Sequence, residues 1–166
     1  MDFNKEKFKM VLHYIINKSG VRNTVGRTVL HKLLYFSDFN HYELYKKSIT
    51  NETYIKKSRG PVPIHFEEAI DELEEEKKIT RGKRKLACGK TMNRYYSLKE
   101  PSVDLTEDEL AVIDKVLKEI GRLNGLLIGR HSLDDAPTKR VEEGDTIDYN
   151  LVFQRNSKYR KRPKED

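Results

Sequence analysis

The side chains best suited to metal binding or acid–base catalysis are spread along this sequence without a recognisable pattern. The chain has five histidines, His13, His31, His41, His65 and His131. No two of them stand four residues apart around a glutamate, the spacing that lets one helix face present two imidazoles to zinc. The histidines therefore predict no metal site, and each is interpreted as a surface or core-edge residue.

Nucleophilic and phosphate-binding motifs are also missing from the sequence. Cys88 is the only cysteine, so it can form neither an internal disulfide nor a zinc cluster of several thiolates. There is no glycine-rich phosphate loop and no Gly-x-Ser-x-Gly motif. Asp134 and Asp135 are adjacent, but an aspartate before Ala-Pro is typical of a turn. We therefore expect a protein that is not an enzyme and that requires neither a metal nor a cofactor.

Charge, by contrast, is concentrated in three short segments. Residues 67–76 carry seven carboxylates, and residues 77–94 carry eight basic groups and no acidic one. Residues 155–166 carry six basic groups against two acidic ones. The net charge of +6 therefore arises from two short basic segments, and binding partners have to be considered segment by segment.

The acidic segment, which falls in a predicted helix, allows two interpretations. A solvated face is the usual explanation of a run of charges, with Lys77 and Lys78 offsetting its C-terminal end. Alternatively, the helix is a docking face for a basic protein partner, because complementary charge accelerates encounter and disfavours wrong partners. The residues assigned to that face are Glu68, Asp71, Glu72 and Glu75. The sequence leaves both interpretations open.

The basic segments point to a second kind of partner. The order of a helix, an acidic helix and two strands resembles a winged helix, in which a β wing contacts phosphate. An acidic helix would be repelled in the major groove, where it would lie between two rows of phosphates. A DNA-binding regulator is therefore the alternative function, with weak binding through basic groups of the hairpin and the tail. These groups are Lys83, Arg84, Lys85, Arg160, Lys161 and Arg162.

Hydrophobic periodicity predicts the elements that would carry these side chains. Apolar residues at helical spacing predict a helix over about residues 4–18, ended by Gly20, and a central core helix that Thr24 would cap. A β-branched and aromatic stretch predicts a short strand at 53–57, and Gly-Pro-Val-Pro at 60–63 predicts a stiff turn. An acidic amphipathic helix is expected to start near Ile64.

The second half of the chain predicts a hairpin and further helices. Two candidate strands joined by residues 87–92 form a hairpin with basic side chains. Thr106 and Glu109 match a capping box for a helix that runs to about Ile120, followed by a shorter helix. We expect one α+β domain over residues 1–154, mostly helical with a short strand and a winged-helix-like β-hairpin, and a flexible basic tail over 155–166.

The sequence shows no recognisable targeting or membrane-spanning segment. Its first residues, MDFNKEKFKMV, carry charges where a signal peptide needs an apolar run. No window approaches the roughly 18 apolar residues of a membrane span. We therefore expect a cytoplasmic protein without a membrane partner.

Two stretches of the sequence are similar to a known family. In the first, HKLLYFSDFNHYELYKKSIT is followed by YIKKSRGPVP. In the second, RHSLDDAPTKRVEEGDTIDY places a histidine and an acidic residue before a proline and a Gly-x-x-Ile pattern. Together they resemble the Panacea domain of SocA-like antitoxins and of phage-associated GepA-like proteins, over about residues 3–150. The matching positions are Lys32, Leu33, Leu34, Tyr35, Gly60, Pro61 and Val62 in the first stretch, and His131, Asp134, Pro137, Gly144 and Ile147 in the second.

The resemblance implies an antitoxin, which is a protein encoded beside a toxin in a bacterium, an archaeon or a prophage. Such a protein binds its toxin and neutralises it without chemistry of its own, so the implied partner is the cognate toxin protein. The leucines and tyrosine of the first stretch are interpreted as core, and its Gly-Pro-Val and Pro137 as structural positions. His131 and Asp134 join the candidate partner-binding residues.

Overall fold

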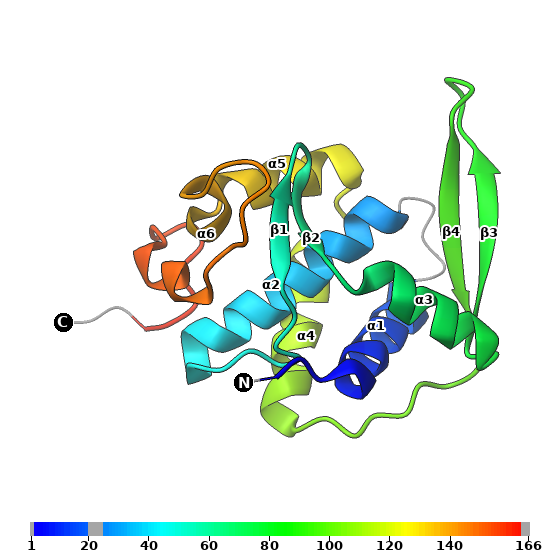
Figure 1. Cartoon of the computed structure of the whole chain (residues 1–166), viewed down its shortest axis with the longest axis horizontal. Coiled ribbons are helices and arrows are strands. Elements are labelled where there is room, and N and C mark those ends of the chain that lie inside the picture. The colour runs from blue at the N-terminus through cyan, green and yellow to red at the C-terminus, as the bar shows by residue number, and fades with distance from the viewer. Residues whose placement is uncertain (1, 20–24, 164–166) are drawn as a thin grey trace.

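Helix α2, Arg27–Tyr45, passes through the middle of the computed structural model, which describes residues 2–19 and 25–163 (Figure 1). Apolar side chains on most sides of α2 are buried, among them Leu30, Leu33 and Phe39, which are fully enclosed. A helix that is apolar over so much of its surface requires neighbours on most sides. The elements that contact it include α1 (Lys5–Ser19), α4 (Glu107–Ile120), α5 (Gly125–Asp134) and the 3₁₀ helix η1 (Tyr149–Gln154).

Two antiparallel hairpins and two further helices complete the fold. Strand β1 (Tyr54–Lys57) pairs with β2 (Gly60–Pro63), and β3 (Ile79–Lys85) pairs with β4 (Thr91–Ser97). Helix α3 (Phe66–Glu75) connects the two hairpins and packs on α1, while α6 (Ala136–Lys139) packs on η1. The predicted class, α+β and mostly helical with a β-hairpin, is confirmed. Among the described residues, no helix combines the length and apolar character needed to cross a membrane.

Several predicted element boundaries agree with the structure. The first helix and the strand at Tyr54–Lys57 lie where they were expected. The capping box of α4 is formed in both directions: the Thr106 side chain accepts from the Glu109 N–H (3.1 Å), and the Glu109 side chain accepts from the Thr106 N–H (2.9 Å). Gly20 and Thr24, expected to end one helix and cap the next, lie outside the described residues.

Residues 60–63 form strand β2 and not the predicted turn, which lies instead at residues 58–59. In an antiparallel pair, only every second residue directs its N–H toward the neighbouring strand. The N–H of Ile64 donates to the carbonyl of Thr53 (3.1 Å). The backbone nitrogens of the two prolines, one and three residues earlier, therefore point away from β1. There a missing donor removes no bond of the ladder. This pairing also delays the start of α3 from Ile64 to Phe66.

The basic segment after Phe153 was expected to be a flexible tail, but its described part is packed. Only 3% of the surface of Arg155 and 2% of that of Tyr159 is exposed. The physical reason is that this segment supplies the counter-charge for carboxylates buried on other elements. The expected boundary at residue 154 therefore does not mark the end of the packed chain.

Candidate partner-binding site

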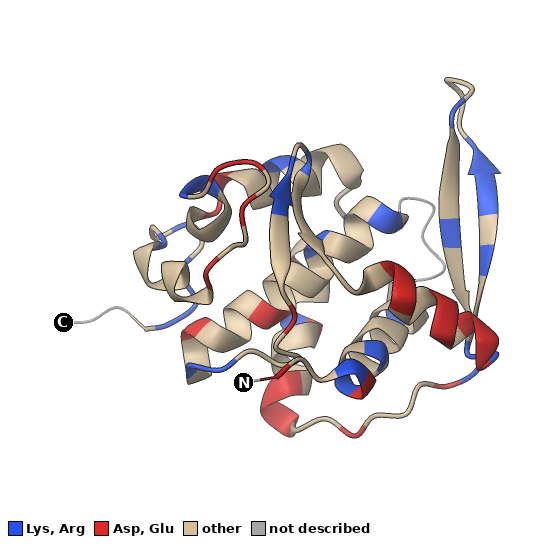
Figure 2. Cartoon of the chain, in the orientation of Figure 1, with Lys and Arg blue, Asp and Glu red and all other residues tan. Residues whose placement is uncertain are grey.

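The acidic helix α3 uses most of its carboxylates within the chain. Figure 2 shows the acidic residues of α3 between the basic residues of α1 and those of β3. The ion pairs are Lys5–Glu68 (2.9 Å), Lys5–Glu72 (2.5 Å), Lys9–Glu72 (3.4 Å), Lys9–Glu76 (2.7 Å), Arg27–Glu67 (3.2 Å), Arg81–Asp71 (2.9 Å) and Arg81–Glu74 (2.9 Å). Hydrogen bonds from Arg81 lower the pKa of Glu74. These contacts connect α3 with three other elements.

The four carboxylates assigned to a docking face differ in how available they are. Glu68, Asp71 and Glu72 each have an intramolecular partner. Glu75 is exposed and makes no ion pair with any residue in the described part of the chain. An acidic face presented to a partner would therefore depend mainly on Glu75, because the charge of the other three is already compensated.

The basic groups of the alternative DNA-binding function do not share one surface. Lys83, Arg84 and Lys85 are exposed on the β3–β4 hairpin, which projects from one end of the molecule (Figure 1). The C-terminal segment lies at the opposite end. There Lys161 pairs with Glu119 (3.0 Å) and Arg162 pairs with Glu43 (2.6 Å), while Arg160 is only partly exposed. If the protein bound DNA, its phosphate contacts would thus come mainly from the hairpin.

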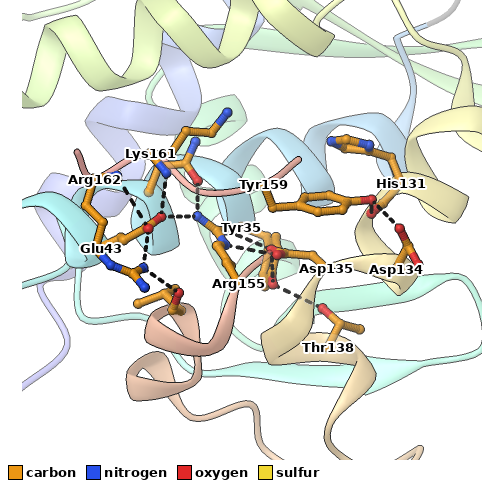
Figure 3. A network of polar contacts seen from close by, with 12 residues as sticks. Tyr35, Glu43, His131, Asp134, Asp135, Thr138, Arg155, Tyr159, Lys161 and Arg162 are labelled. Carbon is orange, nitrogen blue, oxygen red and sulfur yellow. Dashed lines mark hydrogen bonds and ion pairs between the residues drawn. The ribbon is translucent and has the colours of Figure 1, made fainter. Parts of the chain in front are cut away.

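A buried polar cluster is built around Arg155 (Figure 3). Its guanidinium donates to both oxygens of Asp135, from Nε (2.9 Å) and Nη2 (2.7 Å). Its Nη1 donates to Glu43 (2.9 Å) and to Asn40 (2.8 Å) on α2. The side chains of Arg155, Asp135 and Glu43 are fully buried. The bidentate pair satisfies the hydrogen-bonding capacity of the buried Asp135 carboxylate. The ion pairs of Arg155 with Asp135 and Glu43 hold the C-terminal segment on the body of the protein.

The same cluster joins the two stretches that resemble one family. Tyr35, from the first stretch, donates to Asp135 (2.8 Å), and Thr138 of the second stretch donates to the Tyr35 hydroxyl (3.1 Å). The N–H groups of Gly144 and Ile147 donate to carbonyls of β1 (2.7 and 2.9 Å). Positions about a hundred residues apart are thus in direct contact.

His131 and Asp134 contact the C-terminal segment. The His131 ring lies against Phe36 and Tyr159, with ring centroids 5.2 and 4.7 Å apart, and burial lowers its pKa. Asp134 is exposed and accepts a hydrogen bond from the Tyr159 hydroxyl (3.0 Å). Both residues therefore help to hold Tyr159, and only Asp134 presents much surface to solvent.

Lys32 and Gly60 meet where α2, β2 and α5 pack together. The buried ammonium of Lys32 donates to the carbonyl of Pro61 (3.1 Å). Gly60 has φ +117°, and a Cβ there would collide with the Ser132 hydroxyl and lie 2.9 Å from Lys32 Cε. The glycine is therefore required both by its backbone angle and by the space available.

A family model described as "Antitoxin SocA-like, Panacea domain" matches residues 30–137, which is more than half of the chain. The chain belongs to this family. The matched part of the Panacea domain runs from α2 into α6 and includes Lys32, Tyr35, Gly60 and Asp135. Neither the curated proteins nor the solved structures gave a match. Within the described residues, no three histidine, cysteine or acidic side chains gather in a way that would hold a metal ion.

Besides Asp135, sequence reasoning missed two buried acidic anchors on helix α2 of this Panacea domain. Asp38 of α2 accepts from the N–H groups of Ile49 and Thr50 (both 2.9 Å) and from the Tyr54 hydroxyl (2.6 Å). Glu43 is the second anchor and binds Arg155. Both stand on the helix predicted to be the core, where an acidic residue requires a buried partner. The position of these acidic residues in a core helix therefore indicates from the sequence that each has a buried partner, but it does not identify that partner.

The burial of Lys32 gives a pH-dependent prediction. Burial, with a smaller effect of Arg59, lowers the pKa of Lys32 to about 8. The unfolded chain then binds more protons than the folded one between this value and the usual lysine pKa, so the free energy of unfolding should rise with pH in that window. We expect Lys32→Met to remove a rise of about 2 kcal/mol between pH 7 and about 9.5. Urea denaturation of both proteins across this range measures it, and equal slopes would contradict the assignment.

Proposed function

We propose that this Panacea-domain protein is an antitoxin that neutralises a partner toxin by direct protein–protein binding, without chemistry of its own. The supporting observation is the family match over residues 30–137. A toxin encoded beside the gene is the partner that this function requires. The signature residues Lys32, Tyr35 and Gly60 make packing contacts in the interior of the fold, so contacts with the toxin would have to come from other residues.

The proposed function is tested by co-expression with the product of the adjacent open reading frame. The neighbour expressed alone should stop growth, and growth should return when this protein is present. The two proteins should also purify together. A toxic neighbour that this protein neither rescues nor binds would contradict the proposal.

The acidic face of α3 is one proposed contact for a basic toxin surface, and Glu75 allows a clean test of it. Glu75→Lys should weaken toxin binding about tenfold, because it reverses a charge without breaking an internal ion pair. Glu143→Lys is the matched control, since Glu143 is also exposed and lies on the distant loop after α6. Equal affinities of the two variants, measured by calorimetry with purified toxin, would exclude this face.

A further inference from the structure

A cleft of about 1070 Å³ lies beside the β3–β4 hairpin. Its walls are the hairpin, the N-terminal end of α2, the turn between β1 and β2, and α5 (Figure 1). This volume is at or above the upper end of the range for small-molecule pockets, about 300–1,000 Å³. Its size therefore suits a segment of a macromolecule.

The charged side chains that line the cleft are all basic. They are Arg27, Arg59, Arg84, Lys90 and Arg130, and no aspartate or glutamate is among the described residues that line it. Arg27 is paired with Glu67 at the rim. Arg59 and Arg130 are exposed, and neither forms an ion pair with a residue in the described ranges. The cleft therefore presents uncompensated positive charge, which attracts an acidic partner.

The cleft is also lined by aliphatic side chains. Leu86 and Met92 of the hairpin and Leu126 and Leu133 of α5 line the cleft. Leu126 has 63% of its surface exposed. A partner that covered this apolar side chain would remove it from water. Within residues 2–19 and 25–163, no aromatic side chain lines the cleft, although proteins that bind single strands of nucleic acid stack the bases on aromatic rings. The lining therefore favours a peptide with aliphatic side chains over a nucleic acid.

Two glycines allow the walls of the cleft to approach closely. A Cβ on Gly26 would lie 3.0 Å from Met92 Cγ, and one on Gly129 would lie 3.0 Å from the carbonyl oxygen of Arg59. The first contact positions the hairpin against α2, and the second positions α5 against the β1–β2 turn. The basic and apolar groups are thus carried by elements packed against one another.

We propose that this cleft binds an acidic segment of the partner toxin whose carboxylates alternate with leucine-like side chains. The proposal rests on the antitoxin function proposed above and assigns a surface to it. Carboxylates of the segment would pair with Arg59 and Arg130, and its aliphatic side chains would cover Leu126 and Leu133. The acidic face of α3 also adjoins the hairpin, through Arg81, so one toxin can contact both surfaces.

Two pairs of matched variants test the charged and the apolar parts separately. Arg59→Glu with Arg130→Glu reverses charge in the cleft, and Arg122→Glu with Arg140→Glu reverses the same charge at exposed positions outside it. Leu126→Asp changes the cleft, and Leu127→Asp changes the neighbouring exposed leucine, which does not line it. Circular dichroism and urea denaturation confirm that each variant is folded.

The probe is a fluorescent peptide in which glutamates alternate with leucines, measured by fluorescence anisotropy. Both cleft variants should lower its affinity at least about tenfold relative to their controls. Absence of binding to the wild type, or equal affinities of cleft and control variants, would overturn the proposal. Displacement by an oligonucleotide more effectively than by unlabelled peptide would identify a nucleic-acid site and overturn it as well.

Growth rescue with the adjacent gene separates this proposal from the proposed function. Rescue by the wild type and the controls, but not by the cleft variants, supports both. Full rescue by the cleft variants would leave the antitoxin function intact and remove the cleft as its surface. Failure of every protein, the wild type included, would refute the antitoxin function and with it the toxin as occupant of the cleft.

Discussion

Replacing Arg155 with methionine should lower the free energy of unfolding by about 3–5 kcal/mol. The guanidinium makes four hydrogen bonds to Asp135, Glu43 and Asn40, and the charged side chains involved are fully buried. Its removal leaves the Asp135 carboxylate without its counter-charge in the interior. Glu43 keeps only its contacts with the last described residues, including Arg162.

Two further variants show whether the loss arises from an unpaired buried charge. Arg122→Met alters an exposed arginine and should change the stability by no more than about 0.5 kcal/mol. Combining Arg155→Met with Asp135→Asn and Glu43→Gln should restore part of the loss, because no buried carboxylate that has lost the Arg155 charge then remains in the cluster. Urea denaturation measures all three proteins. A triple variant less stable than Arg155→Met alone would contradict this explanation.

Gly60→Ala is the second substitution with a large expected effect. The backbone angle of φ +117° strains any residue with a Cβ by about 1–3 kcal/mol, and the contacts with Ser132 and Lys32 add about 1–3 kcal/mol of overpacking. The variant should therefore lose about 2–6 kcal/mol of stability, and it remains folded only if the free energy of unfolding of the wild type exceeds this loss.

Gly144→Ala provides the matched control for this substitution. Gly144 has a similar φ of +97°, but a Cβ there would meet nothing within 4 Å. Its replacement should cost only the backbone strain of about 1–3 kcal/mol. The difference between the two variants in urea denaturation measures the packing at Gly60. Equal losses would show that α2, β2 and α5 are less tightly packed there than the structure indicates.

The elements whose signal is local could be predicted from the sequence. The helix at 5–19, the α4 capping box and the β3–β4 hairpin depend on spacing and capping within a few residues. The Gly-Pro-Val-Pro stretch predicts a turn because glycine and proline are among the commonest turn residues, but proline is also tolerated in edge strands. Only its pairing with β1 distinguishes the two.

The charges could not be assigned in the same way, because a partner distant in sequence decides whether a charge is available. The acidic run of α3 is compensated by Lys5, Lys9, Arg27 and Arg81 from three other elements. Arg155 lies in a basic run that has the composition of a solvated tail. The one local sign of its burial is Tyr159, an aromatic residue in the same run that is also buried.

The most direct test of the central claim is a titration of purified toxin with this protein, following toxin activity and complex formation together. Neutralisation by binding predicts that toxin activity falls in proportion to the added protein and reaches zero at a fixed molar ratio. At this ratio all the toxin should elute in the complex. Inactivation by far less than one equivalent would indicate catalysis. Loss of activity without a complex would equally contradict direct binding.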